Sequence, residues 1–355
     1  MTISYLKESY ASLIKLFFND EQCEITRTND PNVPSCFNHK SVRTMPIIKE
    51  KHKDGLFMFS SPESLEKYKQ LNSKYFGELN INGFGIPYLH IIRIVSPIGF
   101  PFVDNCSSFK IYKYEVRNAS DPLPLEYPHF EIITSSNHLK LYKILICSID
   151  QFNYEMLGSG KFYFQYYMPD FPISNMLMRW KGLMSDYHFQ MDEMNFNWRQ
   201  CFQFNSKGYV HHRLRLTDVT VPQQDNSTVI ANSLERKFKK KNLKQNVIVA
   251  HLLRIPIKPY DFTRGRGSDF FQWTDLEIGE DSQFHTLGIQ DISPLKERIA
   301  CQGLFFSYRE VEKYELYIYD AVDFMYLPEL MGWDEFYRWK AMNPKTLVVM
   351  LAGNK

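Results

Sequence analysis

Aromatic and methionine side chains alternate with polar ones from Gly160 to Leu216, and this alternation restricts the possible folds more than any other feature of the chain. The segments that show it are KFYFQYYM, MLMRW, DYHFQM, NWRQCFQF and YVHHRLRL. A period of two residues places every second side chain on one face of a β-strand. We therefore predict a series of antiparallel strands here.

Further extended runs, separated by turn residues, lie on both sides of this stretch. They are HIIRIV, FKIYKYEV, HFEIIT, LKLYKILICSI, VIVAHLLRI, DFFQWTDLEI, GLFFSYR and YELYIYD. Aromatic residues make up 15% of the chain, and such side chains suit pleated surfaces, where cross-strand neighbours stack. The expected fold is mainly β (α+β), a large antiparallel sheet or barrel with an N-terminal helical arm and a few peripheral helices. In FKIYKYEV, the face carrying Tyr112, Tyr114 and Val116 is predicted to be buried.

The N-terminal part is predicted to form an arm over residues 1–54. Ile3 to Phe18 has apolar residues at helical spacing, and Asn19 to Asp54 is a polar, proline-broken linker. The helix could bind a membrane surface or act as a mitochondrial presequence. It lacks arginine and carries Glu8, however, so packing on the body of the protein is preferred. Residues 55–355 are predicted to form one β-rich domain.

Two further helices are expected. Ser61 is a suitable N-cap, Pro62 suits the first helical position and Glu63 suits the positive end of the helix dipole. This helix is predicted to end near Tyr75. Another is expected over residues 328–341, and the terminal TLVVMLAG is expected to be a buried last element.

The clearest predicted hairpin joins NWRQCFQF to YVHHRLRL through the turn residues Asn205 to Gly208. On its second strand, alternation should direct Leu214 and Leu216 inward, and Arg213 and Arg215 outward to solvent. A polar excursion from the sheet is expected over residues 221–245.

Charge and cysteine usage exclude several classes of protein. The formal net charge of +2, from 42 basic and 40 acidic residues, creates no global field that demands a nucleic acid or a membrane as partner. The six cysteines form no C-x-x-C pair and are predicted to be reduced core thiols. No secretory or membrane-spanning run is evident. We expect a cytoplasmic protein, with the nucleus and the periphery of membranes as further locations.

The sequence contains no complete motif for catalysis or for binding a nucleotide or a metal. In Gly158-Ser159-Gly160-Lys161 a strand follows where a phosphate loop needs a helix, so a hairpin turn is predicted. Gly83-Phe84-Gly85 lacks the third glycine of a dinucleotide fingerprint. His211 and His212 are adjacent on a strand and point to opposite faces, so they cannot chelate one metal. No nucleophile elbow is present. No catalytic residue, metal ligand or cofactor is predicted.

A positively charged segment, from Arg236 to Lys244, is a candidate for binding. Its cations surround Phe238 and Leu243, and a shorter basic turn follows it in sequence. Attraction to anionic lipid headgroups, phosphate contacts on nucleic acid, a nuclear localisation signal and a merely solvated loop are the competing interpretations. The predicted anion-binding residues are Arg236, Lys237, Lys239, Lys240, Lys241, Lys244, Arg264 and Arg266.

Trp180 and Trp198 adjoin basic residues and could stack on cations or on nucleic-acid bases. Most tryptophans in strands belong to a core, and core positions are preferred here.

The segments MLMRWKG, DYHF, FNWRQCFQF, VIVAHLLRI, YELYIYD and TLVVMLAG resemble, in their order, the elements of tubby-like and LURP-one-like domains. The resemblance covers about Phe109 to Gly353, and an insertion at Gln223 to Gln245 departs from it. It implies an antiparallel barrel around a hydrophobic helix near the C-terminus. In tubby proteins it also implies phosphoinositide binding through basic residues. None of those residues matches one by one, so none is assigned here, and related branches share the barrel without sharing a function.

The leading functional hypothesis is a non-enzymatic binding or adaptor protein, which contacts an anionic membrane surface or another protein through the basic loop. A nucleic-acid-binding protein that uses the same loop with exposed Trp180 or Trp198 is the second. An enzyme whose pocket is assembled from distant residues is the third. A deep cleft containing His188 or His211 would favour it.

Overall fold

The computed structural model describes residues 25–26, 31, 33–37, 39, 41–50, 53–71, 79–94, 108–154, 159–168, 175–181, 186–205, 208–222, 244–254, 270–280 and 292–320. In chain order the elements are η1 (Ser35–Phe37), β1 (Ser41–Glu50), β2 (Leu56–Met58), α2 (Pro62–Gln70), β3 (Leu89–Ile94), β4 (Ser108–Asn118), β5 (Phe130–Ser135), β6 (Leu139–Tyr154), β7 (Ser159–Tyr166), β8 (Asn175–Lys181), β9 (Asp186–Met191), β10 (Met194–Asn205), β11 (Gly208–Pro222), β12 (Lys244–Arg254), β13 (Phe270–Glu280) and α5 (Pro294–Asp320).

Twelve of these strands form an antiparallel barrel, which confirms the predicted fold class. Neighbours follow the order β4-β3-β2-β1-β13-β12-β11-β10-β9-β8-β7-β6, and β6 pairs back onto β4. The remaining strand, β5, pairs with β6 outside this ring. Closure gives each strand of the ring a partner on both sides and so removes sheet edges.

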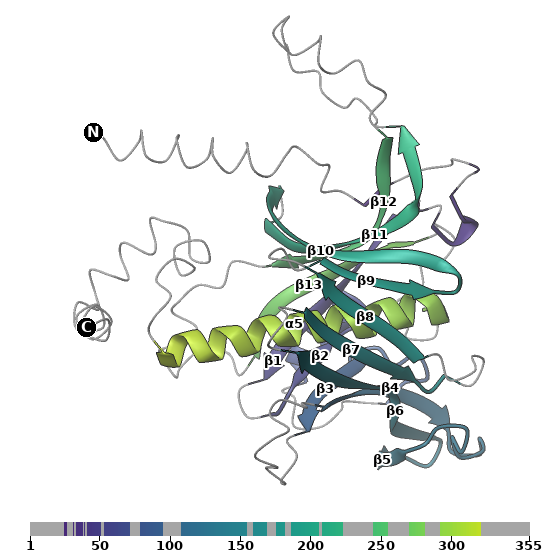
Figure 1. Ribbon diagram of the computed structural model, residues 1–355. Helices are drawn as coiled ribbons and strands as arrows, with labels where there is room; N and C mark the ends of the chain where they lie inside the picture. Colours follow the sequence, from purple (N-terminus) through teal and green to yellow (C-terminus); the bar gives the residue numbers. More distant parts are fainter. Residues whose placement is uncertain are drawn as a thin grey trace, which may run out of the picture.

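Helix α5 runs through the middle of the barrel (Figure 1). Every residue from Glu297 to Ser307 is buried, and a helix that is buried all round must be enclosed by other elements. Its two adjacent phenylalanines contact rings on different strands of the barrel wall. Phe305 meets Phe109 (β4), Phe162 and Phe164 (β7), whereas Phe306 meets Tyr187 (β9), Trp198 (β10) and His212 (β11). The interior is therefore packed with side chains.

The prediction of strands at GLFFSYR and YELYIYD was wrong, because both segments belong to α5. A helix with apolar side chains on all faces lacks the stripe that marks an amphipathic helix, and its aromatic runs imitate strands. Two buried cysteines, Cys147 and Cys301, fit the predicted core thiols, whereas Cys36 is exposed.

A second core lies between α2 and the outer face of the barrel. The start of α2 is confirmed: the Ser61 side chain accepts a hydrogen bond from the Ser64 backbone N–H at 3.2 Å, and Pro62 opens the helix. The helix ends at Gln70 and not near Tyr75. Its apolar side packs on the predicted buried face of β4, so that prediction is also confirmed. The second core consists of Ile48, Phe57, Phe59, Leu65, Tyr68, Ile86, Tyr114, Val116 and Leu141.

Strand β1 lies within the stretch that was predicted to be an irregular linker, and there the prediction was wrong. The strand pairs with β13 over its whole length despite Pro46. Proline lacks an N–H donor, but its carbonyl still accepts, and the Phe59 N–H donates to it at 2.9 Å. The proline therefore breaks the sequence pattern without breaking the strand. The predicted helices over residues 3–18 and 328–341 lie outside the described residues.

Candidate functional site

The predicted anion-binding segment connects β11 to β12. The last register pair of that hairpin joins Pro222 to Lys244, so Lys244 opens β12. The other predicted cations, Arg236, Lys237, Lys239, Lys240, Lys241, Arg264 and Arg266, lie outside the described residues. Their role as an anion-binding set stays a prediction.

The strand that leads into this segment differs from expectation in one respect. β10 and β11 pair as predicted, and Leu214 and Leu216 are buried in the core. Arg213 and Arg215 were predicted to face solvent, which was wrong: they are 3% and 8% exposed. Alternation does place them on the outer side of the sheet. Alternation says nothing, however, about what covers that side.

A buried acid–base pair lies beside Arg213 on the same outer side. The register puts Arg213, His251 and Glu277 in one row across β11, β12 and β13. The Nε2 atom of His251 is 2.5 Å from Oε2 of Glu277, and both side chains are buried. Sequence reasoning missed this pair because its members belong to different strands. The available signal was a polar residue within each of the apolar runs VIVAHLLRI and TDLEI.

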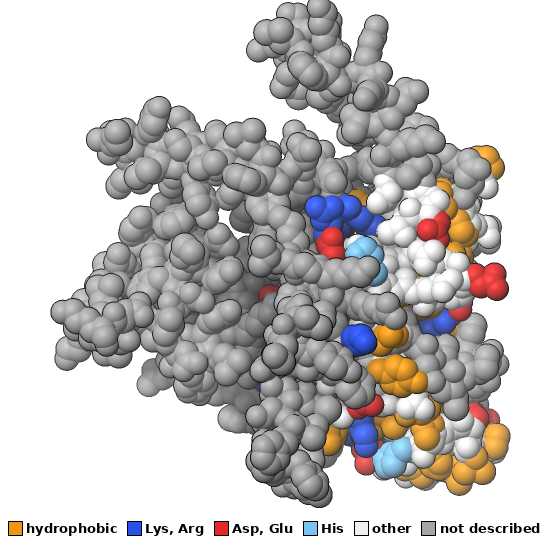
Figure 2. All heavy atoms as spheres, in the orientation of Figure 1, with side chains coloured by type: hydrophobic (Ala, Val, Ile, Leu, Met, Phe, Trp, Pro, Cys, Tyr) orange, Lys and Arg blue, Asp and Glu red, His pale blue; other side chains and the backbone are white. Residues whose placement is uncertain are grey.

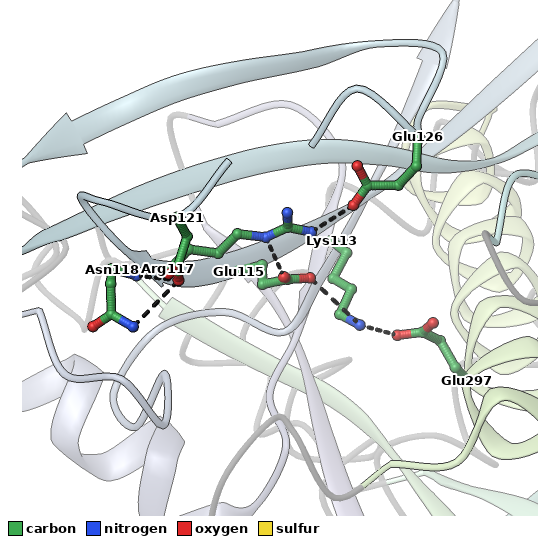
Figure 3. Close-up of polar contacts among 7 residues, drawn as sticks. All are labelled: Lys113, Glu115, Arg117, Asn118, Asp121, Glu126 and Glu297. Carbon is green, nitrogen blue, oxygen red and sulfur yellow. Dashed lines mark hydrogen bonds and ion pairs between the residues drawn. The ribbon is translucent and has the colours of Figure 1, made fainter. Parts of the chain in front are cut away.

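At the first turn of α5, Glu297 is held by Lys113 on β4 (Figure 3) and by Tyr88, which comes directly before β3. Its Oε1 atom accepts a 2.5 Å hydrogen bond from the Tyr88 hydroxyl and lies 2.8 Å from Nζ of Lys113. Burial and the neighbouring Glu297 carboxylate raise the pKa of Tyr88. Burial alone would lower the pKa of Lys113, but Glu297 and Glu115 outweigh it, and the net shift is upward. Lys113 thus stays cationic and Tyr88 stays a donor.

The same chain of charges continues to the surface. Glu115 lies 3.9 Å from Lys113 and 2.6 Å from Nε of Arg117, whose Nη2 is 2.9 Å from Glu126 (Figure 3). The side chain of Glu126 is 36% exposed. Charge therefore alternates in sign from solvent to the buried end of the helix, and each member is neutralised by its neighbours.

The residues on either side of Glu297 bind other parts of the barrel rim. Lys296 is 3.8 Å from Glu280, which also binds Arg43 at 2.8 Å. Arg298 makes a two-pronged contact with Asp192, which lies in the turn between β9 and β10. Asp192 and its neighbour Glu193 have φ values of 50° and 63°, as a tight left-handed hairpin turn requires. Lys296, Glu297 and Arg298 thus attach the start of α5 to three different parts of the barrel.

His90 is a buried histidine on the outer face of the barrel, within the second core. Its ring stacks on Phe57 at 4.1 Å, and its Nε2 atom is 2.8 Å from the backbone carbonyl of Asp54. Burial lowers the pKa of His90 to about 4, although the hydrogen bond to Asp54 opposes the shift. Lys143 and Lys53 also lower this pKa.

We expect the stability of the protein to fall between pH 6.5 and pH 4 because of His90. In that range the unfolded chain takes up a proton at this position that the folded chain does not, so unfolding is favoured as pH drops. The difference of pKa, at 1.36 kcal/mol per unit, amounts to roughly 3 kcal/mol. Urea unfolding from pH 7 to pH 4 should show a weaker pH dependence in His90→Gln. His138→Gln, an exposed control, should behave like wild type, and a His90→Gln curve parallel to wild type would contradict the assignment.

The remaining candidates from the sequence are structural where their side chains are described. Trp198 is fully buried and donates from Nε1 to Gln302 at 2.7 Å, so the hypothesis that it is displayed to bases was wrong. His212 is buried against Phe306, and His188 is exposed and lies 3.2 Å from the Asn197 amide. The side chains of Trp180 and His211 are outside the description.

The glycine motifs serve turns. Ser159 pairs with Tyr154 across β6 and β7, and Gly160 and Lys161 lie within β7, as the predicted hairpin requires. Within the described ranges, no group of His, Cys, Asp and Glu is arranged to hold a metal. None of the described helices is long and apolar enough to cross a membrane.

Comparison with known proteins places the chain in a family. The profile of the DIA1 family matches residues 39–315. Protein DIA1 of Saccharomyces cerevisiae is 27% identical over 321 residues, which cover 87% of this chain and 90% of the yeast protein. The uncharacterised protein YOR385W of the same yeast is 28% identical over 292 residues, which cover 82% and 93%. No solved structure matches. This chain belongs to the DIA1 family.

Proposed function

We propose that this protein is a non-enzymatic binding protein, and that the loop between β11 and β12 attaches it to an anionic surface such as a phosphoinositide-containing membrane. The observation that carries the proposal is the filled interior of the barrel. Because α5 occupies that space over the run of buried residues from Glu297 to Ser307, a ligand has to bind on the outside. The strongest local charge in the sequence lies in the segment between β11 and β12.

The hairpin supplies a firm base for this loop. β11 and β12 pair from Tyr209 with Arg254 to Pro222 with Lys244, so the loop begins and ends on adjacent positions of two long strands. Each basic residue near an anionic membrane contributes on the order of 1 kcal/mol. The six cations from Arg236 to Lys244 would give reversible binding that weakens with salt. Nucleic acid is less favoured, because Trp198 is buried and offers no ring for stacking.

We further propose that the DIA1 family and tubby-like domains share an architecture. The resemblance drawn from the sequence implies an antiparallel barrel around a hydrophobic helix near the C-terminus. The ring of strands around α5 supports this relation. A comparison of the strand order around α5 with that of tubby-like domains would test it. A different strand order would reject it.

Neutralising three loop cations in the variant K239Q/K240Q/K241Q should weaken binding to phosphoinositide-containing vesicles by on the order of 100-fold, because three charge contributions of about 1 kcal/mol are lost. Sedimentation at two salt concentrations measures this affinity. The variant K49Q/K67Q/K110Q removes the same charge from β1, α2 and β4 and should bind like wild type. Equal pelleting of the loop variant and wild type, or preference for RNA over vesicles in competition, would refute the proposal.

A further inference from the structure

Two free cysteines, Cys147 on β6 and Cys301 on α5, are fully buried inside the barrel. Both belong to the hydrophobic cluster that fills the space between the strands and the helix. One thiol thus belongs to the barrel wall and the other to the helix that the wall encloses. Two buried thiols on different elements form a candidate modification site if their side chains meet.

The contacts of α5 place Cys301 opposite one short stretch of β4. Side chains four residues apart share a face of a helix, so Glu297, Cys301 and Phe305 form one row along α5. At the two ends of this row, Glu297 contacts Lys113 and Phe305 contacts Phe109. Those two β4 residues are four positions apart and share a face of the strand. Cys301, midway along its row, therefore faces the middle of that stretch of β4.

The strand register brings Cys147 to the same place. Ile111, at the middle of that stretch of β4, pairs with Cys147 on β6. On its other side Cys147 pairs with Tyr166 on β7. The Tyr166 hydroxyl lies 3.3 Å from Nε2 of Gln302, the residue that follows Cys301. Contacts on both sides thus place the Cys147 side chain against the turn of α5 that carries Cys301.

The two thiols are close enough to act on each other. Burial and the adjoining Cys147 thiol raise the pKa of the Cys301 thiol. Burial and both thiols also raise the pKa of Tyr166, in agreement with the register. A thiol with a raised pKa supplies little thiolate at neutral pH, and the thiolate is the form that reacts. The two cysteines therefore stay reduced until a strong oxidant reaches them.

We propose that Cys147 and Cys301 are an oxidisable pair, which hydrogen peroxide converts to a disulfide that ties α5 to the barrel wall. One thiolate attacks a peroxide oxygen, the O–O bond breaks, and a sulfenic acid and one water form. The second thiol attacks the sulfenic sulfur, so the S–S bond forms and a second water leaves. The peroxide thereby takes up the two electrons and the two thiol protons. It is small and uncharged, which suits a closed interior.

The disulfide adds a covalent link to a helix that is otherwise held by ion pairs and ring packing. It lies one turn beyond Glu297, inside the barrel. Because Cys147 and Cys301 are far apart in sequence, the link also restricts the unfolded chain, so the oxidised protein is more stable than the reduced one. The pair lies apart from the segment between β11 and β12. This inference therefore does not depend on the proposed attachment to an anionic surface.

Peptide mapping of the folded wild-type protein tests the bond. After treatment with hydrogen peroxide and alkylation of the remaining thiols, a non-reduced digest should contain two peptides joined through Cys147 and Cys301. Dithiothreitol should separate them. Cys36→Ala, which removes an exposed cysteine, is the matched control and should give the same joined peptides. Alkylation of both thiols after the treatment, or a bond from either one to a different cysteine, would overturn the proposal.

Reagents of different size separate the interior from the surface. Hydrophobic side chains are exposed at the lower end of the molecule in Figure 2, where Figure 1 places β5. Leu125, on the connection between β4 and β5, is 76% exposed. A maleimide coupled to polyethylene glycol should label Leu125→Cys rapidly in the folded protein and should leave Cys147 and Cys301 unlabelled. Rapid labelling of either native thiol would contradict an enclosed pair.

Urea unfolding measures the effect of the bond on stability. Peroxide treatment should raise the midpoint of wild type by on the order of 1 M, and dithiothreitol should reverse the rise. Cys301→Ala treated in the same way should show no rise. This control separates the disulfide from oxidation of methionine, which disrupts cores. A rise that persists in Cys301→Ala, or the absence of a rise in wild type, would contradict the proposed tie between α5 and the wall.

Discussion

Replacing Phe305 with alanine is expected to lower the free energy of unfolding by about 3–5 kcal/mol, which is the usual cost of removing a fully buried phenylalanine ring. Phe305 is fully buried, and its ring lies 4.9 to 5.4 Å, centre to centre, from the rings of Phe162, Phe109 and Phe164. Those three rings lie on the inner face of strands β4 and β7. They cannot move inward to fill the space without breaking strand pairing, so a cavity remains.

Urea unfolding followed by circular dichroism measures this loss as a lower midpoint with an unchanged slope. Leu125→Ala removes an apolar side chain that is 76% exposed and should change stability by less than about 0.5 kcal/mol. Two equal midpoints would mean that α5 is not enclosed by the barrel.

How far the sequence predicts this fold is seen by comparing β4 with α5. In β4, alternation identified the buried face through Tyr112, Tyr114 and Val116, because one side of the strand carries charge. Every residue of α5 from Glu297 to Ser307 is buried, so no exposed polar side marks its periodicity. Local spacing therefore identifies elements with two different faces, and it fails for an element enclosed by the rest of the chain.

The contacts at the candidate site were beyond sequence reasoning for a different reason. Glu297 meets Tyr88, and Trp198 meets Gln302, across 209 and 104 residues of sequence. Such partners depend on strand order around the barrel, which alternation does not reveal. Arg213 shows the converse: its face of the strand was predicted correctly, but alternation did not predict that the side chain is buried.

Replacing Glu297 with leucine is expected to destabilise the protein by up to about 3–5 kcal/mol, because it leaves Lys113, in a mostly buried position, with only the more distant Glu115 carboxylate at 3.9 Å as counter-charge. The side chain of Lys113 is 17% exposed, and that of Glu297 is 9% exposed. The Tyr88 hydroxyl also loses its acceptor, and an unsatisfied buried donor adds to the cost. Chemical unfolding at pH 7 measures the total effect.

The triple variant Y88F/K113M/E297L separates charge pairing from packing at this position. Apolar replacement of a whole buried polar cluster is often nearly neutral, so the triple variant should be more stable than the single variant Glu297→Leu. Glu126→Gln, at the exposed end of the same chain of charges, should cost less than about 1 kcal/mol. If Glu297→Leu is no less stable than Glu126→Gln, then Glu297 does not hold the entry of α5. In that case the direction of the helix has to be fixed by the contacts of Lys296 and Arg298 and by its aromatic packing.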